Sequence, residues 1–127
     1  MTSIAAAITF TVVIALLAIF QEALIFGAPL GRFAWGGQSD VLPTRLRRGS
    51  VIAIILYAAF SVILLTTSGI LSLPVLEPVA GLLCWMIVAY LAIGVVMNAF
   101  SRSKPERLVM TPVAVLLAVC ALIVALG

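Results

Sequence analysis

The chain has no histidine and few charged residues of either sign. Its 127 residues include seven Lys or Arg and four Asp or Glu, so only 9% are charged. Histidine is the commonest metal ligand and the commonest proton shuttle in proteins, and its absence also excludes a Ser–His–Asp or Cys–His catalytic site. No Walker or dinucleotide-binding fingerprint is present either. We therefore expect no metal and no cofactor, and we expect a protein that is not an enzyme.

Most of the chain is apolar. Hydrophobic residues make up 65% of it, whereas a soluble domain is roughly half apolar and a quarter charged. A membrane-spanning helix needs about 20 apolar residues, and four stretches meet that length: 3–26, 51–71, 79–100 and 108–126. The sequence predicts a single all-α domain over residues 1–127, an integral membrane four-helix bundle whose main partner is the lipid bilayer.

The stretch between the first two spans, residues 27–50, is polar and rich in glycine and proline. It holds five of the nine glycines and four of the seven bases, so we predict a long loop rather than a span. Phe33 and Trp35, beside Arg32, are expected to lie at the level of the lipid headgroups. Pro43 is expected to open a short helix that leads into the second span.

The fourth span is preceded by a signal for the start of a helix. Ser103 and Glu106 have the spacing of a capping box, and Pro105 between them is tolerated in a first helical turn. We predict that the helix begins near Lys104, capped by Ser103. We also predict a bend near Pro112, because proline removes a backbone donor there and crowds the preceding turn.

All seven bases fall in the two loops that would share one side of the membrane. Loop 27–50 carries four and loop 101–107 carries three, while the middle loop and both termini carry none. Bases accumulate on the cytoplasmic side, so we predict both loops in the cytoplasm and both termini outside. Two separate clusters do not suit a nucleic acid, but they suit anionic lipid headgroups. The candidate residues for headgroup binding or topology are Arg45, Arg47, Arg48, Arg102, Lys104 and Arg107.

Glu22 is the charged residue placed deepest in an apolar run. Four small residues precede it on one predicted helix face: Ala7, Thr11, Ala15 and Ala18. Small residues mark helix contacts in membranes, so we predict that Glu22 points into the bundle. A carboxylate at this depth needs a partner, and Arg32 and Gln21 are the candidates nearest in sequence, with Arg32 preferred. The pair is either a structural tie between loop and bundle or a site that couples protons or cations.

A second polar group lies on one side of the third span. Tyr90, Gly94 and Asn98 follow each other at intervals of four residues, and Tyr57 and Ser61 do so in the second span. These residues either line a polar pathway together or form hydrogen bonds between helices.

The two cysteines, Cys84 and Cys120, lie at matching depths in the third and fourth predicted spans. A disulfide is geometrically feasible if those two helices face each other. The alternative, which we favour, is a pair of free buried thiols. With no histidine in the chain and no carboxylate nearby, the cysteines make a poor metal site.

Two stretches resemble a known group of proteins. The resemblance lies in GAPLGRFAWGGQSDVLPTRLRRGS, which starts at Gly27, and in NAFSRSKPERLVMTPVAVLLAV, which starts at Asn98. Both are similar to segments of uncharacterised small four-span bacterial membrane proteins. The resemblance covers most of the chain and implies a multi-pass protein of the bacterial inner membrane, with no activity to carry over. Small multidrug-resistance transporters have a similar size, but their essential glutamate lies near the middle of the first span and their loops are short.

Two functions are compatible with these features. In the first, which the sequence favours, the protein is a non-catalytic structural or interaction component. It self-associates as a homo-oligomer, or it binds lipid headgroups or a partner through loop 27–50. In the second, it is a small oligomeric transporter or channel that uses Glu22 and the Tyr90–Gly94–Asn98 stripe. A water-filled cavity reaching Glu22 would favour the second function, and a dry interior packed by alanine would favour the first.

Overall fold

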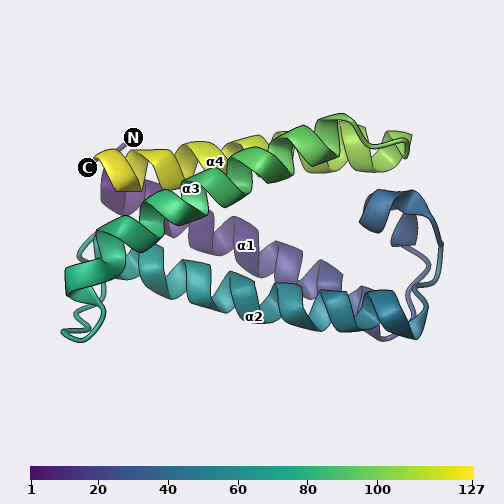
Figure 1. Cartoon of the computed structure of the whole chain (residues 1–127), viewed down its shortest axis with the longest axis horizontal. Helices are drawn as coiled ribbons and strands as arrows, with labels where there is room; N and C mark the ends of the chain where they lie inside the picture. Colours follow the sequence, from purple (N-terminus) through teal and green to yellow (C-terminus); the bar gives the residue numbers. More distant parts are fainter.

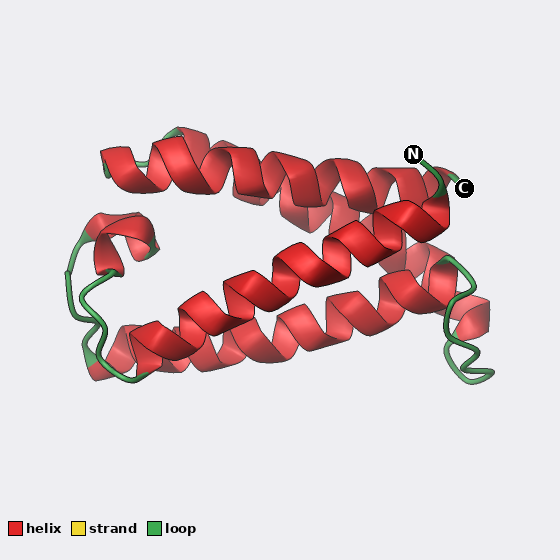
Figure 2. Ribbon diagram, turned by 180° about the vertical axis from the view of Figure 1, so that it is seen from behind, coloured by secondary structure: helices red, strands yellow, loops and turns green.

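The structure is a computed structural model that describes all 127 residues. It contains four long helices: α1 (Ser3–Ile25), α2 (Thr44–Thr67), α3 (Glu77–Ala99) and α4 (Thr111–Leu126). Three short helical segments accompany them: η1 (Gly31–Phe33), η2 (Trp35–Gly37) and η3 (Glu106–Met110). Lys104 and Pro105 are also helical and lead into η3, and the chain contains no strand (Figure 2).

Each long helix is long and apolar enough to cross a membrane. The four candidate spans contain 21 to 24 residues, with η3 and α4 counted together as Glu106–Leu126, and a span needs about 20. Large apolar side chains such as Leu16, Ile55 and Ile93 are exposed on the outside of the bundle, where lipid would cover them. The prediction of an all-α, four-span bundle is confirmed, and the chain is a small multi-pass membrane protein.

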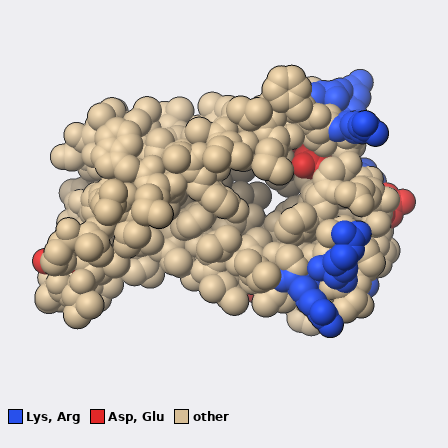
Figure 3. Space-filling model, in the orientation of Figure 1, with Lys and Arg blue, Asp and Glu red and all other residues tan.

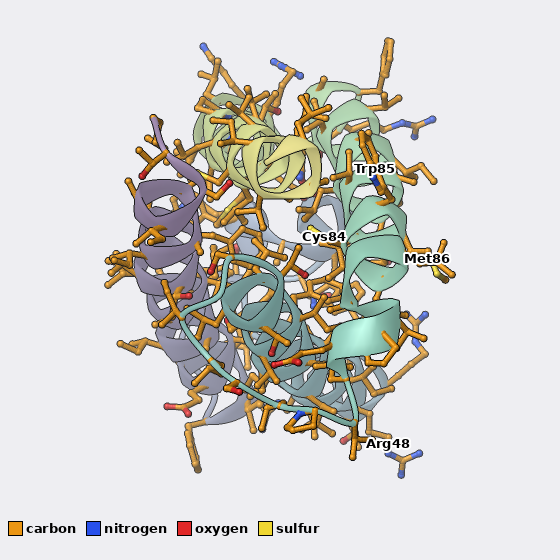
Figure 4. All side chains as sticks on the ribbon, turned by 90° about the vertical axis from the view of Figure 1, so that its left-hand side faces the viewer. Arg48, Cys84, Trp85 and Met86 are labelled. Atoms are coloured by element: carbon orange, nitrogen blue, oxygen red, sulfur yellow. The ribbon has the colours of Figure 1, made fainter.

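The helices are arranged as a ring, seen end-on in Figure 4. α1 packs mainly against α2 and α4, and α3 packs mainly against the same two helices. Both termini lie at one end of the bundle, together with the turn from α2 to α3 (Figure 1). The α1–α2 pair and the α3–α4 pair diverge toward the opposite end, where η1 and η2 lie between them (Figures 1 and 2). Figure 3 shows the basic side chains gathered at that second end.

The half of the bundle that contains the termini has a continuous core. Its members are almost completely buried and come from all four helices: Ala6, Ala7, Phe10, Leu64, Cys84, Cys120, Ala121 and Val124. The small residues allow close approach of the helices. Both cysteines are free, as expected, and the Cys84 thiol lies 3.6 Å from the carbonyl oxygen of Ala121. Figure 4 shows Cys84 turned inward and Trp85 and Met86 turned outward.

The helix of the second span starts directly after Pro43, where the sequence predicted that a short helix opens. Pro43 has an extended backbone, and its carbonyl accepts from the amides of Leu46 and Arg47, each at 3.0 Å. α2 therefore starts at Thr44, and the basic residues form its first turns. The predicted short helix at Pro43 is thus continuous with the span.

The fourth span begins at Lys104 as predicted, but its first turns have a different structure. η3 is a π-helical turn, and α4 continues from Thr111. This wider turn comes directly before Pro112, which has no amide hydrogen to donate, so the disturbance expected there is a π turn. The predicted capping box is wrong. The Ser103 hydroxyl donates to the carbonyl of Arg32, and Glu106 accepts from Gly36 instead of reaching back to Ser103.

Candidate functional site

Residues 27–43, which we call the plug, fold back onto the start of α2. The Trp35 indole nitrogen donates to the hydroxyl of Ser50 at 3.3 Å. The indole ring lies so close to Gly49 that a Cβ there would be 2.8 Å from it. The Arg47 guanidinium donates to the carbonyl of Leu42 at 2.7 Å. The plug is therefore anchored to α2 by its aromatic ring and by its last residues.

The other side of the plug binds the segment that leads into α4. The amide of Gly36 donates to Oε2 of Glu106 at 2.9 Å. Gly36 and Gly37 have φ values of 75° and 72°, a region that glycine adopts without steric cost. A side chain at Gly37 would also collide with Ser103. The plug thus joins the two diverging helix pairs at their open end.

A cavity of about 560 Å³ lies behind the plug. It extends from Trp35 and Glu106 at the plug to Ile14 and Leu117 in the middle of the bundle, where the continuous core begins. Of its 24 lining residues, 17 are hydrophobic. Its size lies within the range of roughly 300–1,000 Å³ that is typical of small-molecule sites. This is the volume and lining expected for a small apolar ligand with a polar group.

A few polar side chains face the cavity from different elements. They are Gln21, Gln38, Tyr57, Tyr90, Asn98, Ser101 and Glu106. Gln21 is only 7% exposed. Its amide nitrogen donates to the hydroxyl of Tyr57 over a long 3.4 Å, and its Oε1 atom has no hydrogen-bond partner. Buried polar atoms normally have a partner, so this oxygen is an unused acceptor beside the cavity.

A second, smaller hollow lies between α2 and α3. It has a volume of about 230 Å³, and all seven lining residues are hydrophobic: Leu56, Phe60, Ile63, Leu83, Met86, Ile87 and Tyr90. Phe60 and Tyr90 also line the large cavity, and their rings meet edge to face with centroids 5.3 Å apart. The groove and the large cavity therefore meet at this pair of rings.

The structure brings together part of the predicted polar group. Tyr57, Tyr90, Gly94 and Asn98 all line the cavity. Ser61 is half-buried and is not among the lining residues. The stripe on α3 therefore faces an open space, although the role of these residues stays a prediction.

The predicted direction of Glu22 and its pairing with Arg32 are wrong. Glu22 is exposed, and Arg32 is exposed with its guanidinium 4.9 Å from the centroid of the Phe33 ring. The inner face of α1 is a different stripe at spacings of three and four: Ala7, Phe10, Ile14, Leu17, Gln21 and Leu24. Because lipid makes every face of a span apolar, small residues alone were a poor guide to the inner face. One residue is about 100° on a helix, so Gln21 points inward and Glu22 outward.

Phe33 and Trp35 both line the cavity. The indole ring of Trp35 packs directly against Gly49 of α2. The aromatic residues of the plug therefore belong to the site. That these rings lie at the level of the lipid headgroups stays a prediction.

The six candidate headgroup residues fall into two groups. Arg47 and Arg107 are half-buried and donate to the carbonyls of Leu42 and Ser101, so they hold the loops in place. The other four are exposed at the plug end: Arg45, Arg48, Arg102 and Lys104. Figure 4 shows Arg48 pointing away from the bundle.

Sequence reasoning missed two residues of the site. Glu106 was assigned to helix capping, and Gln21 was considered only as a neighbour of Glu22. For Gln21 a signal exists, because Phe10, Ile14 and Leu17 precede it at the spacing of a packed helix face. For Glu106 the local sequence offers no such signal, since its partner Gly36 lies 70 residues away.

Comparison with known proteins gives no functional lead. No known family matches the chain, and neither a curated protein nor a solved structure is similar to it at a significant level. The four-span architecture implied by the sequence resemblance is shown by the fold, and the resemblance itself stays a prediction.

Proposed function

We propose that this membrane protein binds a small lipid-soluble molecule in the cavity behind the plug and acts as a carrier or receptor for it, without catalysis. The observation that carries the proposal is the cavity itself, which is mostly apolar and has a few polar side chains in its lining. A molecule with an apolar body and one polar group would match both parts of the lining. This is a version of the transporter hypothesis in which Glu106 replaces Glu22.

The groove between α2 and α3 supports access from the bilayer. Its lining is entirely hydrophobic, and it meets the cavity at Phe60 and Tyr90. Tyr90 is 54% exposed, so rotation of its side chain toward lipid meets little resistance from the bundle. A molecule dissolved in the acyl chains would then reach the cavity without crossing water.

A channel fits these features less well than a carrier. The cavity ends at the continuous core of the half that contains the termini, where Phe10, Leu64 and Cys84 are completely buried. The plug covers its other end. Passage across the membrane would therefore need a change of conformation.

The test is to fill the cavity without disturbing the fold. Gly94 lines the cavity, and a Cβ at this position would have nothing within 4 Å. We expect the purified wild type to bind a neutral hydrophobic dye, and we expect Gly94→Leu to fold normally and to lose that binding. Gly81→Leu is the matched control, because Gly81 lies on the same helix with equally free space but outside the cavity. Equal dye binding by both variants and the wild type would refute the proposal.

A second candidate function is a structural or interaction component that binds lipid headgroups through its exposed bases. Arg45, Arg48, Arg102 and Lys104 support it, because all four are exposed at one end of the bundle. It predicts that replacing these four with Gln abolishes the retention of anionic lipid by the purified protein, while dye binding is unchanged. This second function also includes self-association into a homo-oligomer. Light scattering of the protein–detergent complex would test the self-association.

We also propose that the plug end faces the cytoplasm and that both termini face outward in a cell inner membrane. Support comes from the location of all seven bases at that end. The test uses a background in which Cys84 and Cys120 are replaced by Ala. Ser72→Cys should react with an impermeant thiol reagent in intact cells, and Lys104→Cys should react only after lysis, since both positions are exposed. The reverse pattern would invert the orientation.

A further inference from the structure

The cavity contains a single charged side chain, the carboxylate of Glu106. We infer that the ligand is an organic cation with a hydrophobic body, which the cavity holds between this carboxylate and a set of aromatic rings. The inference rests on the proposed function, because it names the class of molecule that the same cavity would take.

Glu106 is buried, with 8% of its surface exposed. It accepts a hydrogen bond from the amide of Gly36 through Oε2, and the hydroxyl of Ser101 lies beside the carboxylate. None of the seven Lys or Arg residues is among the lining residues. A buried charge is costly unless an opposite charge compensates it, so an ionised Glu106 needs a cation, and the cavity offers the space for one.

Aromatic rings make up a large part of the lining of the cavity that contains this carboxylate. Six of the ten aromatic residues of the chain line the cavity: Phe20, Phe33, Trp35, Tyr57, Phe60 and Tyr90. The face of an aromatic ring attracts cations, most strongly when water is excluded. Rings from α1, the plug, α2 and α3 therefore provide an apolar lining that favours positive charge over negative charge.

The unused acceptor of Gln21 favours the same sign of charge. Its Oε1 atom is buried beside the cavity and accepts no hydrogen bond. A carbonyl oxygen carries a partial negative charge and is complementary to an ammonium group or to the acidic C–H groups next to a cationic centre. Neither this oxygen nor Glu106 would stabilise an anion.

The experiment compares two probes of nearly the same shape and opposite charge. Tetraphenylphosphonium is a hydrophobic cation and tetraphenylborate a hydrophobic anion, and neutral triphenylmethane serves as a third probe. Equilibrium dialysis of the purified protein in detergent measures binding. In a Trp85→Phe background Trp35 is the only tryptophan, so a change in its emission locates the bound probe at the cavity.

Three variants distinguish the role of the charge. Glu106→Gln keeps an oxygen that can accept from the Gly36 amide and removes the charge. Glu22→Gln makes the same change at an exposed site outside the cavity. Gly94→Leu fills the cavity. We expect tetraphenylphosphonium to bind the wild type and Glu22→Gln equally, and to bind Glu106→Gln at least about tenfold more weakly, the effect of losing one charged interaction. Tetraphenylborate should bind all of them weakly.

The failures of the two proposals are distinguishable. If both ions bind equally well, and Glu106→Gln changes neither affinity while Gly94→Leu abolishes both, the cavity binds hydrophobic molecules but does not select cations. That result overturns the inference and leaves the proposed function intact. If neither ion nor triphenylmethane changes the emission of Trp35, and dialysis shows no binding, both proposals fail. Circular dichroism of Glu106→Gln, with the wild-type spectrum expected, verifies that its helices have folded.

Discussion

The two halves of the bundle differ although the same four helices form both. In the half that contains the termini, the inner side chains are almost completely buried, among them Phe10, Leu64 and Val124. In the half beside the plug, the helices enclose a cavity of about 560 Å³ whose lining includes polar groups. We conclude that tight packing over half the length keeps the helices together, which allows the other half to remain hollow.

Residue size explains the difference. Ala6, Ala7 and Ala121 let the helices approach closely where the core is continuous. Toward the plug, inward positions carry large side chains such as Phe20 and Tyr57, and the helix pairs diverge (Figures 1 and 2). The plug then joins the separated pairs through its hydrogen bonds to Ser50 and Glu106.

The largest expected effect is a difference in unfolding free energy between two Leu→Ala substitutions, one made in each half of the bundle. Leu64→Ala removes a side chain that is 0% exposed in the continuous core, and we expect it to lower the free energy of unfolding by about 2–4 kcal/mol. Leu17→Ala removes a partly buried side chain that already borders the cavity, so its cost should stay below about 1 kcal/mol. Titration with sodium dodecyl sulfate, followed by circular dichroism, measures both. Equal losses would mean that the halves are packed alike.

The sequence was sufficient to predict the spans, because the signal for each is the summed hydropathy of about 20 residues. It was also sufficient to place the start of the fourth helix at Lys104. These features depend on local sequence, and neither requires knowledge of how the helices are rotated.

The site depends on helix rotation and on contacts between distant residues, which one sequence does not reveal. The inner face of α1 was assigned from its small residues, and the resulting error of one position exchanged Gln21 for Glu22. The contact of Gly36 with Glu106 joins the plug to η3 across 70 residues, and no pattern near either residue indicates it. The stripe of Tyr90, Gly94 and Asn98 was placed correctly on one face, since helical spacing alone defines it.

An intermediate effect is expected where the plug meets α2. In Gly49→Ala the new methyl group would collide with the Trp35 ring, so the plug must shift, at a cost of about 1–3 kcal/mol. The emission of Trp35, measured in a Trp85→Phe background, should move to longer wavelength as water reaches the indole. Gly81→Ala is the control, because a Cβ there meets nothing within 4 Å. Unchanged emission in Gly49→Ala would show that the contact between Trp35 and Gly49 does not hold the plug against α2.

The smallest expected effect on stability has the opposite sign, and it concerns Gln21. Its Oε1 atom has no partner, and its bond to Tyr57 is long at 3.4 Å. A buried polar group that is poorly bonded costs free energy, and an apolar replacement of similar volume can recover part of it. Gln21→Met should therefore raise the free energy of unfolding by about 0.5–1 kcal/mol, and it should weaken tetraphenylphosphonium binding because an acceptor is lost from the cavity. A polar residue that lowers stability while it improves binding would identify the hollow half as the functional half. A loss of more than about 1 kcal/mol in Gln21→Met would instead show that the amide holds α1 to α2, and that this half is built for stability in the same way as the other.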